Sequence, residues 1–148
     1  MIGSSVTEKA WLNQIPSDRP VLIIAEGLLY YLTEDEVKIL LKRLVNHFPG
    51  GQITFDTFST FGVRMQRFLQ RLPNSRAMGN PGVRLKWGLN NPHEIEEWMP
   101  QVKLITELSG ADLPDIMKMS KGIIRQMITI PSHIPQIRRG LMMLRYQF

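Results

Sequence analysis

A short apolar run that stops at a carboxylate and a glycine is the feature that most constrains the fold. The sequence PVLIIA occupies Pro20 to Ala25, and Glu26 and Gly27 follow it directly. A continuously apolar, β-branched run of this length is typical of a strand covered on both faces, as in sheets flanked by helices. The run therefore predicts a buried strand of an α/β protein, with a polar turn at its carboxyl end.

A well-marked helix follows this strand. Thr33 and Glu36 have the spacing of a capping box, and Pro49 with two glycines ends the segment. Between these signals the apolar residues recur at helical spacing: Val37, Leu40, Leu41, Leu44, Val45 and Phe48.

The rest of the chain continues to alternate strands and helices, which favours an α/β sheet over a bundle or a sandwich. We expect four main strands, beginning near Pro20, Ile53, Val102 and Leu141. Helices are expected over Phe61 to Leu72, from Asn91 to Pro100 and over Asp115 to Ile128, and the longest loop over Asn74 to Pro81.

Composition bounds the class of protein. The chain has 148 residues, of which 43% are hydrophobic, enough for one globular domain with a core of its own. It has no cysteine, which excludes disulfides, zinc-thiolate sites and thiol nucleophiles. We find no secretory signal and no apolar run long enough to cross a membrane, and we therefore expect a soluble, cytoplasmic protein without a membrane partner.

The basic residues are unevenly distributed. The formal net charge is +5, and residues 57–93 and 116–148 each contain six Lys or Arg and no Asp or Glu. A basic surface of this kind suggests nucleic acid as a partner. However, the bases are dispersed at helical spacing and no nucleic-acid-binding motif accompanies them, which favours solvated helix faces. We expect no nucleic-acid partner.

Two carboxylates lie where the predicted strands end. Glu26 follows the first strand and Asp56 lies near the end of the second. In open α/β sheets ligands bind beyond the carboxyl ends of the strands, and Gly27 would let the backbone approach a ligand closely. The alternative for each carboxylate is a local role, accepting hydrogen bonds from backbone amides of a turn.

Four segments together resemble a known enzyme family. They are AEGLLYYLTEDEVKILLKRL, FPGGQITFDTFS, WGLNNPHEIEEW and LRYQF. In this order and spacing they resemble the carboxyl-terminal half of the leucine carboxyl methyltransferase family, in particular its bacterial polyketide O-methyltransferase-like branch. The resemblance covers almost the whole chain, and the block around Glu26 is its most specific part.

The resemblance implies a Rossmann-like class I methyltransferase that uses S-adenosyl-L-methionine. Residues 1–148 would be the carboxyl-terminal part of one domain and supply strands four to seven of a seven-stranded sheet, the last strand antiparallel. Glu26 and Gly27 would lie beside the methionine part of the cofactor. Ser5 and Val6 match the turn after the third strand, near the adenine, although the family often has Asp where this chain has Ser5.

The chain also departs from the family. No segment matches the first strand with its glycine-rich turn, the acid that holds the ribose, or the arginine expected near the cofactor carboxylate. We therefore expect a truncated chain that carries half of a cofactor site and is inactive alone, with its first strand at a sheet edge. The alternative is a non-catalytic α/β remnant that binds a partner, or a second copy, through that edge.

A methyltransferase of this kind implies a small-molecule methyl acceptor, whether a carboxylate, a phenol or a polyketide hydroxyl. Tyr30, Tyr31 and Trp87 are candidates for the wall of its pocket, and Arg64 is a candidate to bind an acceptor carboxylate. Tyrosines after a strand often have only a packing role, and an arginine on a helix is often simply solvated.

The sequence does not identify a catalytic base. His93 and Tyr30 are weak candidates for a residue that takes a proton from the acceptor. The three histidines have no metal-ligand spacing, so we expect no metal site. The absence of a G-x-S-x-G motif disfavours a hydrolase.

Overall fold

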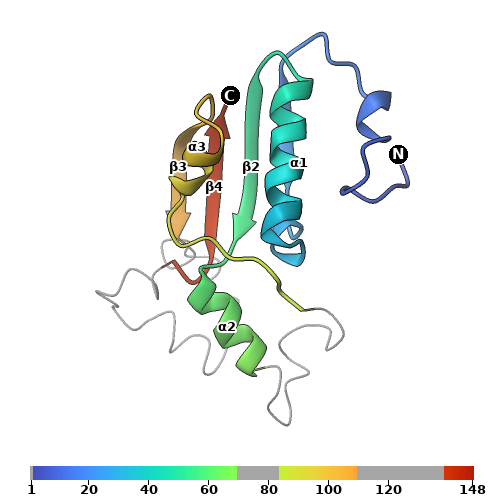
Figure 1. The fold of residues 1–148 in the computed structure, drawn as a ribbon. Helices are drawn as coiled ribbons and strands as arrows, with labels where there is room; N and C mark the ends of the chain where they lie inside the picture. Colours follow the sequence, from blue (N-terminus) through green and yellow to red (C-terminus); the bar gives the residue numbers. More distant parts are fainter. Residues whose placement is uncertain (1, 70–83, 110–138) are drawn as a thin grey trace.

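The computed structural model describes residues 2–69, 84–109 and 139–148, which form an open sheet with helices (Figure 1). The predicted helix at 115–128 and the predicted loop at 74–81 lie outside these residues. In chain order the elements are η1 (Leu12–Gln14), β1 (Val21–Ala25), η2 (Leu29–Tyr31), α1 (Glu34–His47), β2 (Gly51–Thr57), α2 (Thr60–Leu69), α3 (Glu94–Trp98), β3 (Lys103–Ser109) and β4 (Met142–Gln147).

The sheet has four strands in the order β1-β2-β4-β3. Strands β1 and β2 pair in parallel, whereas β4 runs antiparallel to both of its neighbours. The four strands, the edge position of the first and the antiparallel direction of the last are thus as the sequence predicted. The arrangement is consistent with the partial Rossmann-like sheet that the resemblance implied.

Helix α1 begins with the predicted capping box. The Thr33 side chain accepts a hydrogen bond from the Glu36 amide (3.3 Å), and the Glu36 carboxylate accepts one from the Thr33 amide (2.7 Å). These two bonds satisfy amides that have no partner inside the helix. The apolar stripe of α1 is buried, and the helix ends before Phe48, as the proline and glycines predict.

The core lies between one face of the sheet and the helices α1 and α3, which both lie in front of the sheet in Figure 1. Alternate residues of β2 and β4 point into it, and the rings of Phe55 and Tyr146 stack at 5.6 Å between centroids. The Tyr146 hydroxyl donates to the Pro92 carbonyl oxygen (2.8 Å). Burial raises the pKa of this phenol, so it stays a neutral donor.

The face of β1 that points away from the core is exposed, although the sequence predicted a strand covered on both faces. The apolar run predicted a strand covered on both faces, but Leu22 and Ile24 are 63% and 67% exposed. Successive side chains of a strand point to opposite faces, and the described helices α1 and α3 lie on only one of them. Met143 and Leu108, which pair across β4 and β3, are also exposed.

Helix α3 is shorter than the sequence predicted. The Asn91 side chain accepts from the His93 amide (3.2 Å), and the Glu94 carboxylate accepts from the Asn91 amide (3.1 Å). The expected cap is therefore present, but the residues after it form a turn, and the helix itself begins at Glu94.

Candidate functional site at the strand ends

The parallel pairing of β1 and β2 places two carboxylates at the same end of the sheet, where both strands reach their carboxyl ends. Ala25 pairs with Phe55, so that Glu26 and Asp56 follow neighbouring positions on the two strands. We use the name strand-end site for Glu26, Gly27, Tyr30 and Asp56. The sequence predicted that both carboxylates lie on the ligand side of the sheet, and the register places them at the carboxyl ends of β1 and β2, where ligands bind in open α/β sheets.

The turn after β1 is held by Asp56. The Gly27 amide donates to the Asp56 carboxylate with a distance of 2.7 Å, across 29 residues of sequence. Gly27 has φ +64°, a backbone conformation that glycine adopts without the strain of a side chain. Asp56 thus accepts a hydrogen bond from the backbone of a turn, which was one of the two roles considered for it. The turn, however, follows the neighbouring strand β1 and not β2 itself.

Glu26 has no such local role. Its side chain is exposed, and within residues 2–69, 84–109 and 139–148 its carboxylate takes part in no hydrogen bond or ion pair. The alternative that Glu26 accepts hydrogen bonds from its own turn therefore does not describe this structure. The result is a carboxylate at a strand end that is available to a cation.

Tyr30 packs against this turn. Its ring makes edge-to-face contacts with Tyr31 (4.6 Å) and with Phe58 (5.1 Å). Burial, together with the negative charge of Asp56, raises the pKa of Tyr30 to about 12. The phenol is therefore protonated at neutral pH, which suits a hydrogen-bond donor better than a general base.

The backbone of Tyr30 anchors a distant segment. Its carbonyl oxygen accepts from the amides of Lys86 (2.8 Å) and Trp87 (3.3 Å). The Trp87 side chain is only 4% exposed and packs near Phe55 and Trp98, so its indole is enclosed by the core. Tyr31, in contrast, is 36% exposed beside Tyr30.

Ser5 and Val6 lie in the amino-terminal segment, which passes beside α1 (Figure 1). Ser5 shares a hydrogen bond with Thr7 between their side chains (2.8 Å), and the Val6 carbonyl accepts from the Trp11 indole (3.2 Å). In the part of the chain that the structure describes, no hydrogen bond joins these two residues to the strand-end site.

Among the described residues, no hydrogen bond or ion pair joins Arg64 or His93 to the strand-end site. Arg64 is exposed on α2, and none of the ion pairs between described residues involves it. His93 is exposed at the start of α3, where its Nδ1 lies 3.1 Å from the Glu96 carboxylate. Their predicted roles in acceptor binding and proton transfer stay predictions.

The described residues contain no group of three or more side chains that could hold a metal ion. None of the helices in those residues is long and apolar enough to cross a membrane.

The sequence pointed to Glu26 and Gly27 but not to the hydrogen bond between Gly27 and Asp56. The signal that was available was a carboxylate near the end of each of two successive strands.

Comparison with known proteins supports the resemblance. No protein-family model matches the chain. The chain is 34% identical over 151 residues to the tetracenomycin polyketide synthesis O-methyltransferase TcmP of Streptomyces glaucescens, an alignment that covers 100% of this chain and 52% of that protein. It is 36% identical over 104 residues to the S-adenosyl-L-methionine-dependent methyltransferase dpfgK of Gibberella zeae, covering 66% of this chain and 34% of that protein.

A solved structure supports the fold alone. The structure of a DUF574 family protein from Streptomyces avermitilis has a TM-score of 0.53 and 12% identity, and the match covers 97% of this chain and 53% of that one. The chain thus spans about half the length of that structure, and about half the length of TcmP, which aligns with the whole of this chain. These findings confirm the similarity to methyltransferases that the sequence segments indicated.

Proposed function

We propose that this chain forms one half of the active site of an S-adenosylmethionine-dependent O-methyltransferase. The observation that carries the proposal is the carboxylate of Glu26, which has no partner among the described residues and lies beside the left-handed turn at Gly27, in a chain similar to two methyltransferases. The cofactor is a cation that carries a carboxylate, an ammonium and a sulfonium group. An exposed anion next to a turn that permits close backbone approach fits its cationic groups.

In this proposal the residues of the strand-end site have separate roles. When bound, S-adenosylmethionine supplies an electrophilic methyl group to an acceptor oxygen. Glu26 orients the cationic part by charge, and Gly27 lets it approach the backbone. Asp56 keeps the Gly27 turn in place through its 2.7 Å hydrogen bond. Methyl transfer needs no covalent enzyme intermediate, so positioning and electrostatics account for most of the catalysis.

Tyr30 and Tyr31 would form the acceptor side of this site. The neutral phenol of Tyr30, with its pKa raised to about 12, donates a hydrogen bond to the acceptor and does not take its proton. The proposed acceptor is a small molecule with a carboxylate, phenol or polyketide hydroxyl. TcmP is named for tetracenomycin polyketide synthesis, which favours a polyketide hydroxyl among these.

The test uses a chimera in which this chain replaces the matching part of TcmP. In this chimera Glu26→Gln should weaken S-adenosylmethionine binding by about 1.5–3 kcal/mol, the range for a hydrogen bond to a charged group. Titration calorimetry measures the affinity. Glu97→Gln is the matched control, because Glu97 is exposed on α3. Unchanged affinity in a folded Glu26→Gln chimera would reject the proposed role of Glu26.

We further propose that the chain alone binds S-adenosylmethionine poorly, because it spans about half the length of TcmP. Calorimetric titration of the isolated chain should then give no saturable binding at micromolar ligand. Saturable binding under these conditions would mean that the 148 residues complete a cofactor site by themselves.

A second candidate function is that of a non-catalytic module that binds a partner or a second copy. The observation that favours it is the edge position of β1, with Leu22 and Ile24 exposed beside it. A chimera that folds and binds the cofactor but transfers no methyl group would favour this candidate.

A further inference from the structure

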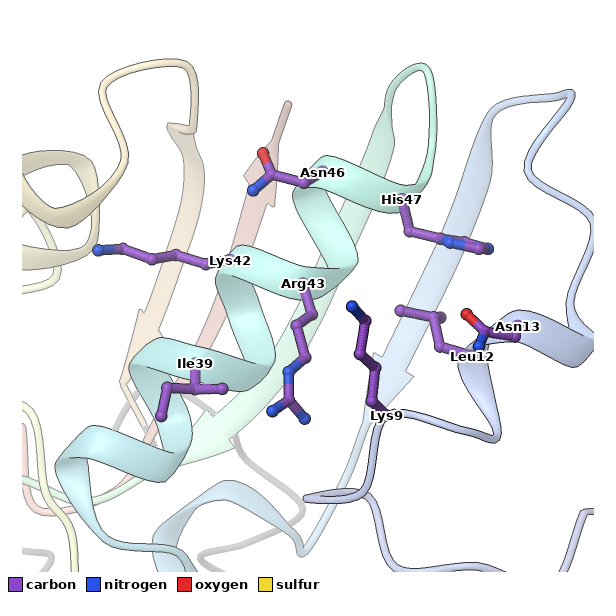
Figure 2. A pocket seen from close by; sticks show the side chains of 8 residues that line it. All are labelled: Lys9, Leu12, Asn13, Ile39, Lys42, Arg43, Asn46 and His47. Atoms are coloured by element: carbon purple, nitrogen blue, oxygen red, sulfur yellow. The ribbon is translucent and has the colours of Figure 1, made fainter.

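A basic groove lies between the amino-terminal segment and α1, and none of its residues belongs to the strand-end site. It is an open depression of about 420 Å³. We call it the amino-terminal groove, and its lining is Lys9, Leu12, Asn13, Ile39, Lys42, Arg43, Asn46 and His47 (Figure 2). The lining contains two amides and no acidic residue.

The positively charged side chains of Lys9 and Arg43 both line the groove. In Figure 2 the side chains of Lys9 and Arg43 enter the same space from opposite walls and run past each other, whereas the Lys42 side chain points away from that space. Neither Lys9 nor Arg43 forms an ion pair among the described residues. No acidic residue in the described part of the chain lines the groove to offset these two charges, and an anion between them would be attracted by both.

The groove is also held in shape. Arg43 donates through Nη1 to the Thr7 carbonyl oxygen (2.7 Å), which fixes its guanidinium and leaves other N–H groups for a ligand. His47 lies with Nε2 3.0 Å from the Ile15 carbonyl oxygen. A carbonyl can only accept, so Nε2 carries a proton. These bonds attach both ends of the segment 7–15 to α1.

An apolar surface lies next to the charges. Ile39 is 48% exposed and Leu12 is 5% exposed, and in Figure 2 they lie on opposite sides of Lys9 and Arg43. A guanidinium and an ammonium together match the charge of a phosphate group, and the aliphatic side chains offer a place for an organic part. The volume falls within the about 300–1,000 Å³ typical of small-molecule sites, which favours a small ligand over a nucleic acid.

We propose that the amino-terminal groove binds a small organic phosphate, with its phosphate between Lys9 and Arg43 and its apolar part on the exposed side chain of Ile39. This site does not depend on methyl transfer. By contacting both walls, the ligand would also hold the amino-terminal segment against α1.

Phenyl phosphate is the probe, and NMR of the isotope-labelled full chain is the measurement. We expect saturable shifts of backbone amides in residues 7–15 and 39–47. Inorganic phosphate should shift the same amides more weakly, because it lacks the apolar part, and benzyl alcohol should not shift them. No saturable shift with millimolar phenyl phosphate would overturn the proposal.

Charge variants locate the site. Lys9→Gln, at an exposed position whose side chain makes no hydrogen bond to described residues, should weaken phenyl phosphate binding by about fivefold. Lys103→Gln removes the same charge from β3 and is the matched control. Equal weakening by both variants would mean attraction to net charge alone and would reject the site. A single-stranded oligonucleotide that binds more tightly than phenyl phosphate would also reject it, in favour of a nucleic-acid surface.

Discussion

At the scale of single residues, the sequence predicted the positions of the strand-end site but not its bonds. Glu26 and Gly27 were found because an apolar run stops there, and Asp56 because a second strand ends there. The hydrogen bond from Gly27 to Asp56 depends on the register of β1 against β2, which no local pattern encodes. The same holds for Trp87, whose burial depends on Phe55 and Trp98, from other parts of the chain.

The Asp56→Asn variant should lower the pKa of Tyr30 from about 12 toward its ordinary value of 10. The carboxylate of Asp56 disfavours the tyrosinate, and the variant removes this charge while burial remains. Ultraviolet titration of the phenols measures the change, with Tyr30→Phe to identify the signal of Tyr30. Asp18→Asn, an exposed site paired with Arg19, is the control. An unchanged titration would show that Tyr30 does not sense Asp56.

The same pKa predicts a loss of stability in alkali. Folding raises the pKa of Tyr30, so the folded protein holds this proton more tightly than the unfolded chain. The resulting stabilisation is fully present below pH 10 and is lost as the pH rises to about 12. In Tyr30→Phe the free energy of unfolding should fall less steeply over this range; an identical slope in both proteins contradicts the prediction.

At the scale of elements, local sequence signals predicted the structure correctly where both interacting residues lie in the same short segment. Thr33 and Glu36 are three residues apart, so their capping box and the start of α1 could be predicted. The burial of β1 could not, because an apolar run does not say which elements will cover each of its faces. Leu22 and Ile24 are exposed for this reason.

Thr33→Ala should reduce the free energy of unfolding by about 1 kcal/mol, since it leaves the Glu36 amide without its capping acceptor. Urea denaturation at neutral pH measures the loss. Ser17→Ala, at an exposed position before β1, should have no comparable effect.

The capping box also predicts a dependence on acid. The Thr33 amide and hydroxyl, which donate to Glu36, lower the pKa of its carboxyl below 4.5 in the folded protein. A lowered pKa stabilises the fold above pH 4.5, and this contribution is lost as the pH falls through the folded value. The difference in stability between the parent chain and Glu36→Gln should therefore shrink in acid. A constant difference would argue against an ionised cap.

At the scale of the whole molecule, the described sheet has an unpaired edge and an uncovered apolar face that meet at β1. An exposed strand edge is a template for pairing with another chain. We predict that the isolated chain self-associates through this edge or binds a hydrophobic dye. Light scattering with dye fluorescence tests this.

A double change of Leu22 and Ile24 to Lys should suppress the association, because it places charge beside the edge. Phe68→Lys, which changes an apolar side chain 59% exposed on α2, is the control. A parent chain that remains a monomer and binds no dye would contradict the prediction.

The position of β4 between β2 and β3 has a consequence for the order of events during synthesis. Thr54 on β2 donates to the Leu144 carbonyl oxygen, 90 residues further along the chain. Until those residues leave the ribosome, β2 lacks one of its two neighbours and β3 has no partner in the described sheet. Two strands alone are marginally stable at best, and contacts this distant in sequence form slowly. The nascent chain must therefore avoid aggregation, with β2 open on one side, until β4 is synthesised and pairs with both β2 and β3.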